Sequence, residues 1–79
     1  MKKVVIYSTP SCTYCNMAKE FFKANNVQYE NFDVAIDPVK RQEMVEKSGQ
    51  MGVPVIFIDD QMIIGFNKRA LSEALGIAA

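Results

Sequence analysis

The sequence predicts an α/β fold with the element order βαβαββα, in which helices cover both faces of a four-stranded mixed sheet. The run Lys3–Ser8 is apolar without alternation, as expected of a strand that is covered on both faces. Strand-like and helix-like segments then alternate, which is typical of a βαβ unit with parallel strands. Val55–Ile58 and Met62–Gly65 flank a polar turn at residues 59–61, which predicts an antiparallel hairpin. With 79 residues the chain can build one core, so we expect a single domain over residues 1–79.

The first half of the chain contains one helix between two strands. After a break at residues 9–11, Ala18, Phe21 and Phe22 lie at i, i+3 and i+4, which predicts a helix from Thr13 to about Asn25. Asparagine suits the end of this helix because it tolerates the left-handed conformation. Val27–Val34 is the second expected strand, although its apolar phase slips; a bulge or burial on both faces would explain the slip.

The helices of the second half are marked by their end signals. Asp37 followed by Pro38 predicts a helix start, and Gly49 predicts its end. Few apolar residues lie between these signals, so we expect this helix to be largely exposed. A last helix is expected from Asn67 to Leu75, with Gly76 ending it.

Composition excludes several classes of function. Nine Lys and Arg residues balance nine Asp and Glu residues, so the chain has no electrostatic footprint for nucleic acid or for an anionic membrane. The longest apolar run, Val53–Ile58, is far shorter than a membrane span, and no segment suits a secretory signal. We therefore expect a cytoplasmic protein, in a compartment where lasting structural disulfides are rare.

The only two cysteines of the chain, Cys12 and Cys15, are separated by two residues at the start of the first expected helix. Backbone N–H groups at a helix start have no partner within the helix, and the helix dipole favours negative charge there. A thiolate at Cys12 is stabilised by this environment, which lowers the thiol pKa and makes Cys12 the expected nucleophile. Cys15 lies one turn further on the same side and can attack a mixed disulfide on Cys12. The pair therefore predicts disulfide exchange.

Two other interpretations of the cysteines are weaker. Structural zinc needs about four nitrogen or sulfur ligands, and this chain has no histidine and no third cysteine. A metal would have to be shared by two copies of the chain or bound through carboxylates, which are poorly matched to zinc, so we expect no metal site. A pair of unreactive core cysteines is the other interpretation, and the position at a helix start argues against it.

The chain resembles the glutaredoxins, small proteins with the thioredoxin-like fold, over nearly its whole length. The residues that carry the resemblance are Cys12-Thr13-Tyr14-Cys15, Val53-Pro54 and Gly65-Phe66-Asn67, in the element order given above. The resemblance implies a thiol–disulfide oxidoreductase with catalytic Cys12 and Cys15, with no bound cofactor and with glutathione as reducing co-substrate. It also implies a monomer that acts on disulfide-containing proteins.

The resemblance gives the proline motif a role as well. The simplest interpretation of Pro54 is that it begins a strand, where its lack of a backbone N–H removes no hydrogen bond from the sheet. In thioredoxin-like folds this proline follows a cis peptide bond, and the same is implied for the bond between Val53 and Pro54. The backbone of Val53 would then lie beside the Cys12 sulfur, where a substrate backbone can pair with it like an added strand.

Departures from the family pattern affect the expected glutathione site. Glutaredoxins commonly have a lysine three residues before the first cysteine, where this chain has Thr9. Asn67 is expected either to bind the γ-glutamyl end of glutathione or to serve only as a helix N-cap. In the second case Phe66 packs on Leu71 as a hydrophobic staple. Tyr14 either flanks a bound thiol or is simply exposed.

The identity of the reductant is the open question of the sequence. A glycine followed by phenylalanine at the last helix, here Gly65 and Phe66, also resembles the glutaredoxin-like redoxins that supply electrons to ribonucleotide reductase. Those proteins are re-reduced by thioredoxin reductase. We expect glutathione as the reductant, with thioredoxin reductase as the alternative. A third hypothesis, from a different functional class, is a dimeric iron–sulfur or zinc carrier that uses Cys12 without catalysis.

Overall fold

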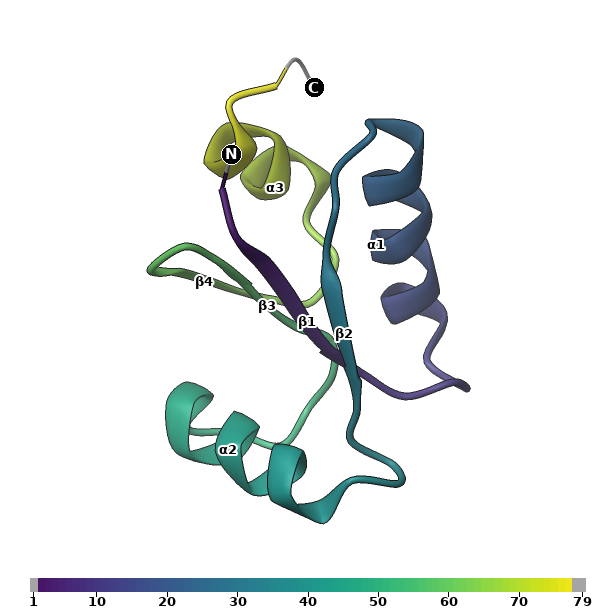
Figure 1. Ribbon diagram of the computed structural model, residues 1–79, viewed down its shortest axis with the longest axis vertical. Coiled ribbons are helices and arrows are strands. Elements are labelled where there is room, and N and C mark those ends of the chain that lie inside the picture. The colour runs from purple at the N-terminus through teal and green to yellow at the C-terminus, as the bar shows by residue number, and fades with distance from the viewer. Residues whose placement is uncertain (1, 78–79) are drawn as a thin grey trace.

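The structure is a computed structural model that describes residues 2–77. It contains the predicted elements in the predicted order (Figure 1). The strands and helices are β1 (Val4–Ser8), α1 (Thr13–Ala24), β2 (Glu30–Asp33), α2 (Pro38–Ser48), β3 (Val55–Ile58), β4 (Gln61–Ile64) and α3 (Lys68–Leu75). Within residues 2–77, no helix has the length and apolar character needed to cross a membrane.

The four strands form one mixed sheet in the spatial order β2-β1-β3-β4. β1 runs parallel to β2 and antiparallel to β3, and β4 closes the hairpin with β3. Tyr7 in β1 pairs with Phe32 on one side and with Val55 on the other. The carboxyl end of β1, from which the chain leaves toward the cysteines, therefore lies between β2 and β3.

Side chains of β1 alternate between two cores, one on each face of the sheet. Ile6 and Tyr7 are adjacent in sequence and both essentially unexposed, at 0% and 1%. Ile6 belongs to the core under α1 and α3, and Tyr7 to the core under α2. Figure 1 shows α2 apart from the other two helices. This two-sided burial explains why β1 is apolar without alternation, and it confirms the predicted arrangement of helices.

The predicted end signals of the helices are confirmed. The Asp37 side chain accepts the backbone N–H of Lys40 at 3.0 Å and so caps α2. Gly49 ends that helix in the left-handed conformation, with φ 73°, where a glycine has no steric cost. At the end of α1 the left-handed residue is Asn26, with φ 56°.

The second strand is shorter than predicted: β2 covers Glu30–Asp33 instead of residues 27–34. The slip in its apolar phase arises from burial on both faces. Tyr29, just before the strand, packs on Phe22 of α1 with ring centroids 5.3 Å apart. Phe32 packs on Tyr7 in the other core, at 5.5 Å.

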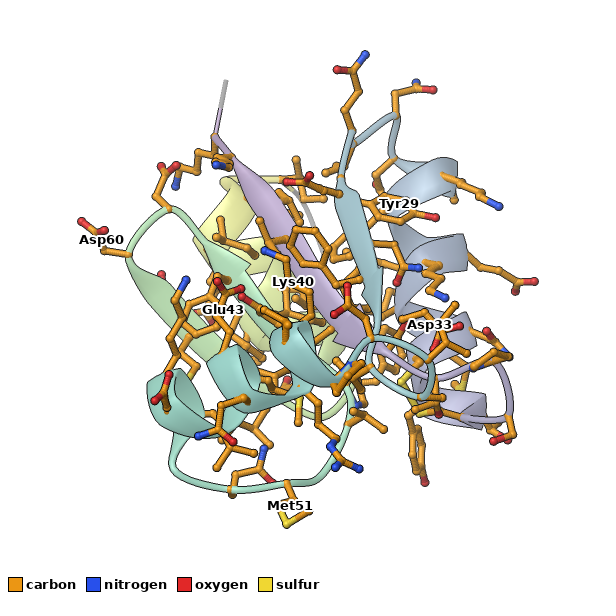
Figure 2. All side chains as sticks on the ribbon, turned by 60° about the horizontal axis from the view of Figure 1, so that its bottom comes forward. Tyr29, Asp33, Lys40, Glu43, Met51 and Asp60 are labelled. Carbon is orange, nitrogen blue, oxygen red and sulfur yellow. A yellow bond between two sulfur atoms is a disulfide. The ribbon has the colours of Figure 1, made fainter. Side chains whose placement is uncertain are left out.

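Polar contacts attach α2 to the sheet. Met44 is the only buried residue of this largely exposed helix, as its composition predicts. The hydroxyl of Tyr7 donates to Glu43 Oε2 at 2.5 Å, and Lys40 Nζ lies 4.1 Å from the ring centre of Phe32. Figure 2 shows Lys40 and Glu43 on the side of α2 that faces the sheet. Hydrogen bonding and cation–π contact thus add to a narrow apolar face.

Candidate active site

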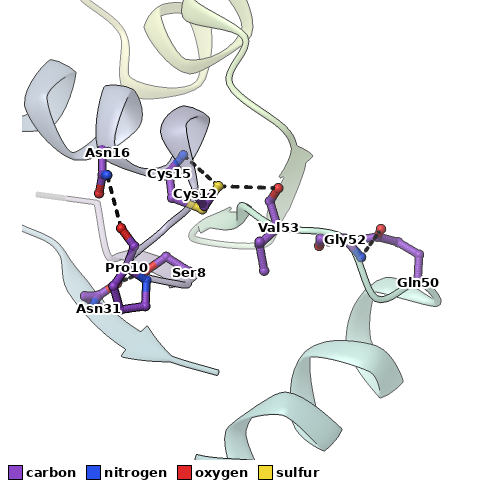
Figure 3. The surroundings of a disulfide bond; sticks show 9 residues. All are labelled: Ser8, Pro10, Cys12, Cys15, Asn16, Asn31, Gln50, Gly52 and Val53. Carbon is purple, nitrogen blue, oxygen red and sulfur yellow. Dashed lines mark hydrogen bonds between the residues drawn. A yellow bond between two sulfur atoms is a disulfide. The ribbon is translucent and has the colours of Figure 1, made fainter. Parts of the chain in front are cut away.

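The two cysteines lie where β1 gives way to α1. Cys12 is the N-cap residue of the helix, and Cys15 is in its first turn. A disulfide joins them, with Cα atoms 5.2 Å apart (Figure 3). Cys12 is partly exposed, whereas Cys15 is completely buried. The sequence spacing therefore brings the two sulfurs together, and only the Cys12 residue is accessible from solvent.

The start of α1 supplies a hydrogen-bond donor to the outer sulfur. Cys12 Sγ accepts the backbone N–H of Cys15 at 3.1 Å, in the way that a serine or aspartate oxygen caps a helix. In the reduced protein the same N–H group and the positive end of the helix dipole would face a thiolate. This geometry favours the ionised form of Cys12.

The loop before β3 forms the opposite wall of the site. The peptide bond between Val53 and Pro54 is cis, as the resemblance implied. The carbonyl oxygen of Val53 lies 3.8 Å from Cys12 Sγ, and Figure 3 shows it directed toward the disulfide. Pro54 is buried, and its carbonyl accepts the backbone N–H of Gly65 at 2.8 Å. The structure thus brings Val53 to the cysteines across 41 residues of sequence.

Three hydrogen bonds hold the end of β1 and the segment that leads from it to α1. The Thr9 carbonyl accepts the backbone N–H of Cys12 at 3.2 Å. The Pro10 carbonyl accepts Nδ2 of Asn16 at 3.4 Å. The buried Ser8 hydroxyl donates to Asn31 Oδ1 at 2.5 Å, which ties the end of β1 to β2. The first bond closes a four-residue turn around Pro10. The bonds of Asn16 and Asn31 follow no such spacing rule, so sequence patterns do not reveal them.

The remaining predicted site residues lie on the surface or at the start of α3. Tyr14 is 61% exposed, in accord with either of its two predicted roles. Gly65 has φ 83°, a left-handed conformation that only glycine adopts at little cost. Phe66 packs on Phe21 of α1, with ring centroids 6.2 Å apart. It also packs against the core cluster that contains Leu71.

Asn67 is the N-cap of α3, and that predicted role is confirmed. Its Oδ1 accepts the backbone N–H of Ala70 at 3.0 Å. Arg69 in the first turn of the helix pairs with Glu73 at 3.2 Å, which offsets part of the positive charge of Arg69. Lys68 borders a hollow of about 590 Å³ between α1 and the start of α3. The hydrogen bonds of Asn67 to the N–H groups of Ala70 and Leu71 thus lie within its own helix and do not reach the cysteines.

The side chains of residues 2–77 contain no group of three or more His, Cys, Asp or Glu that lie close enough together to hold a metal ion. A metal held through Cys12 would need ligands from outside this part of the chain.

Comparison with known proteins gives a consistent picture. The glutaredoxin family model matches residues 4–63. An uncharacterised glutaredoxin-like 8.6 kDa protein in the rubredoxin operon of Clostridium pasteurianum is 43% identical over 72 residues, which cover 91% of this chain and 96% of that protein. Glutaredoxin 3 of Escherichia coli strain K12 is 36% identical over 76 residues, covering 96% and 92% of the two chains.

Among solved structures, a mutant of the thioredoxin-like protein BC3987 superposes with a TM-score of 0.91 at 37% identity. The match covers 99% of this chain and 100% of that one. The sheet order, the paired cysteines at a helix start and these matches agree on fold and on family. The chain belongs to the glutaredoxin family of thiol–disulfide oxidoreductases.

Proposed function

We propose that this protein reduces protein disulfides and glutathione mixed disulfides through Cys12 and Cys15, and that glutathione restores the dithiol. The observation that carries the proposal is the asymmetry of the two sulfurs. Cys12 Sγ is partly exposed and accepts the Cys15 N–H at 3.1 Å, while the Cys15 side chain is completely buried. One sulfur is therefore placed to meet a substrate and the other to act after it.

The reaction has three steps. The Cys12 thiolate attacks a substrate disulfide, forms a mixed disulfide and releases one substrate sulfur as a thiol. Cys15, as a thiolate, then attacks Cys12 Sγ and releases the second substrate thiol, which leaves the Cys12–Cys15 disulfide seen in the structure. Two glutathione molecules reduce this disulfide and leave as glutathione disulfide, so two electrons pass from glutathione to the substrate.

The substrate is proposed to lie between the cysteines and the Val53 backbone. The Val53 carbonyl, 3.8 Å from Cys12 Sγ, is available to a backbone N–H of a peptide that carries the disulfide. Tyr14 and the segment from Gly65 to Asn67 are proposed to border the bound peptide. The chemistry suits the cytoplasm, where the glutathione pool is kept reduced.

The electrostatics of the site bear on the choice of reductant. Thr9 stands where the family commonly has lysine, and one exposed ion pair contributes only about 0.2–1 kcal/mol, so its loss weakens glutathione binding without preventing it. Lys68 and the N-terminus of α3 still attract a carboxylate. The alternative is reduction by thioredoxin reductase, which the missing lysine and the apolar Phe66 favour. On balance we place glutathione first.

A coupled assay separates the two reductants. One arm contains glutathione, glutathione reductase and NADPH; the other contains thioredoxin reductase and NADPH; both use the mixed disulfide of cysteine and glutathione. We expect turnover in the first arm. The Cys15→Ser variant should retain it, because a second glutathione can replace the internal thiol. Cys12→Ser, the matched control, should abolish turnover in both arms.

The opposite pattern would identify the alternative function. If only thioredoxin reductase supports turnover, and Cys15→Ser abolishes it, the protein is a redoxin that needs its internal disulfide. No turnover in either arm, with a fully reduced protein, would reject oxidoreductase function toward this substrate class.

A further inference from the structure

The loop that presents Val53 to Cys12 is held by a side chain outside the family motifs. This loop runs from the end of α2 to β3, and residues 50–54 belong to neither helix nor strand. Ladder hydrogen bonds therefore do not fix the backbone of Val53. Other contacts must therefore hold the Val53 backbone if its carbonyl is to stay beside the Cys12 sulfur.

Gln50 makes two hydrogen bonds to the backbone of Gly52. Its Oε1 accepts the Gly52 N–H at 2.7 Å, and its Nε2 donates to the Gly52 carbonyl at 2.9 Å. One side-chain amide thus pairs with a backbone donor and acceptor, as a neighbouring strand would. We call this pair of bonds the Gln50–Gly52 clamp. Figure 3 shows it on the side of the loop away from the disulfide, while the Val53 carbonyl faces the disulfide.

The clamp is connected to α2. The backbone N–H of Gln50 donates to the Ser48 hydroxyl at 3.4 Å, and that hydroxyl donates to the Met44 carbonyl at 2.6 Å. Met44 is completely buried in the core under α2. A continuous set of contacts therefore runs from the core through Ser48 and Gln50 to Gly52, next to Val53.

Gly52 is matched to the clamp. A Cβ atom at this position would lie 2.8 Å from Gln50 Oε1, too close for the amide to keep its place. The Gly52 backbone does not need a positive φ, because its φ is outside that range. An alanine here would thus displace the flexible Gln50 side chain and leave the rest of the loop able to keep its conformation.

We propose that Gln50 is a positioning residue, which acts through Gly52 to hold the Val53 backbone in register with Cys12 for a peptide substrate. This role rests on the proposed function. The clamp uses the N–H and carbonyl of Gly52, and the carbonyl of the next residue, Val53, lies 3.8 Å from Cys12 Sγ. A substrate then pairs with one residue of the loop, which suits a short peptide such as a glutathione mixed disulfide.

The experiment is a double-mutant cycle of wild type, Gln50→Ala, Gly52→Ala and the double variant. Steady-state rates are measured with the glutathione mixed disulfide of cysteine, and single-turnover rates with dithiodipyridine, a disulfide without peptide groups. We expect each single variant to raise KM for the peptide disulfide about threefold to tenfold, with kcat and the dithiodipyridine rate unchanged. The double variant should be no worse than either single one, since both remove the same clamp. Gln28→Ala, at an exposed glutamine elsewhere, is the matched control.

A readout independent of activity tests the clamp itself. In the reduced protein, hydrogen exchange of the Gly52 amide should accelerate in Gln50→Ala, while amides of β3 keep their protection. The inference would be overturned if Gln50→Ala left KM or the exchange of the Gly52 amide unchanged. It would also be overturned if the dithiodipyridine rate fell as much as the rate with the peptide disulfide, or if the effects of the two single variants multiplied in the double variant. A wild type that reduces dithiodipyridine but not the peptide disulfide would instead reject the proposed function, and the positioning role with it.

Discussion

The backbone N–H of Cys15 donates to the sulfur of Cys12 across 3.1 Å, although the side chain of Cys15 has no exposed surface. One residue therefore contributes in two ways to the site. Its backbone N–H would face a thiolate on Cys12 in the reduced protein, and its own side chain is buried. The two cysteines therefore differ in exposure and in hydrogen bonding.

The first prediction concerns which cysteine is alkylated. In the reduced protein at pH 7, iodoacetamide should label Cys12 at least about tenfold faster than Cys15, because Cys12 is both ionised more readily and more accessible. Peptide mapping after partial alkylation measures both rates in one sample. Cys15→Ser should keep the fast phase and Cys12→Ser should lose it. Faster labelling of Cys15 would reverse the assigned roles.

A second prediction concerns the Tyr7–Glu43 hydrogen bond that joins β1 to α2. Tyr7→Phe removes a 2.5 Å bond to a carboxylate, which we expect to lower the free energy of unfolding by about 1–2 kcal/mol at pH 7. Urea unfolding of the oxidised protein measures this change. Tyr29→Phe is the matched control, because it removes a hydroxyl from a ring that packs on Phe22. If the two variants lost the same free energy of unfolding, the hydrogen bond to Glu43 would contribute nothing to stability.

The same bond predicts how stability depends on pH. Hydrogen bonding from Tyr7 lowers the pKa of Glu43 below its usual 4.5, so the folded state favours the carboxylate. The resulting stability is present above pH 4.5 and is lost as the pH falls through the lowered pKa of folded Glu43. Burial, and then the bond to Glu43, raise the pKa of Tyr7, so stability is also lost above pH 10, where the unfolded chain ionises first. Tyr7→Phe should reduce the loss of stability both at acid pH and above pH 10. If both losses were unchanged in this variant, the Tyr7–Glu43 bond would not be their cause.

A third prediction separates the two roles of Asn67. Asn67→Ala loses the cap on Ala70 and should cost about 0.5–2 kcal/mol of stability, whereas Asn67→Ser keeps a capping oxygen and should cost far less. If the amide also binds glutathione, both variants raise KM for glutathione, by about threefold to tenfold for one hydrogen bond. We expect that rise. An unchanged KM in Asn67→Ser would leave the residue with its capping role alone.

The sequence predictions were most accurate where the residues that determine a feature lie close together in the sequence. Helix ends were placed well because capping is local: Asp37, Gly49, Asn67 and Gly76 satisfy or end backbone bonds within a few residues of themselves. The strand at residues 27–34 was placed less well, since Tyr29 and Phe32 belong to two different cores that only the folded sheet defines. No periodicity distinguishes such a strand from an irregular one.

In the candidate site, too, local sequence spacing predicted some contacts, and others depend on the folded structure. Cys12 and Cys15 are close because their spacing at a helix start makes them so, and Val53 could be placed beside them only through the family resemblance. The bonds from Gln50 to Gly52 and from Ser8 to Asn31 depend on side-chain conformations and on strand register, which leave no repeat in the sequence. Sequence reasoning therefore brought the two cysteines together and missed the side-chain hydrogen bonds around them.

The last prediction follows from the surroundings of Cys15. Thioredoxins use a buried acid in the strand behind the cysteine pair to deprotonate the second cysteine, and β1 of this protein, Val4–Ser8, contains no acid. The chain also has no histidine. Glu43, the carboxylate that bonds to Tyr7 of β1, lies on α2, across the sheet from the helix that carries Cys15. We therefore expect Cys15 to lose its proton to solvent or to the departing sulfur.

Without a general base, the rate of the resolving step should follow the ionisation of Cys15 itself. The reduced protein is first converted to the mixed disulfide of Cys12 with thionitrobenzoate, and the coloured thiolate released by attack of Cys15 is then followed. Between about pH 6 and the pKa of Cys15 the rate should rise about tenfold per pH unit, because only the thiolate attacks. The leaving group is ionised throughout and adds no pH dependence of its own. Cys15→Ser, which should release nothing, controls for hydrolysis. A resolving rate that stays level across this range would reveal a base acting on Cys15 within the folded protein.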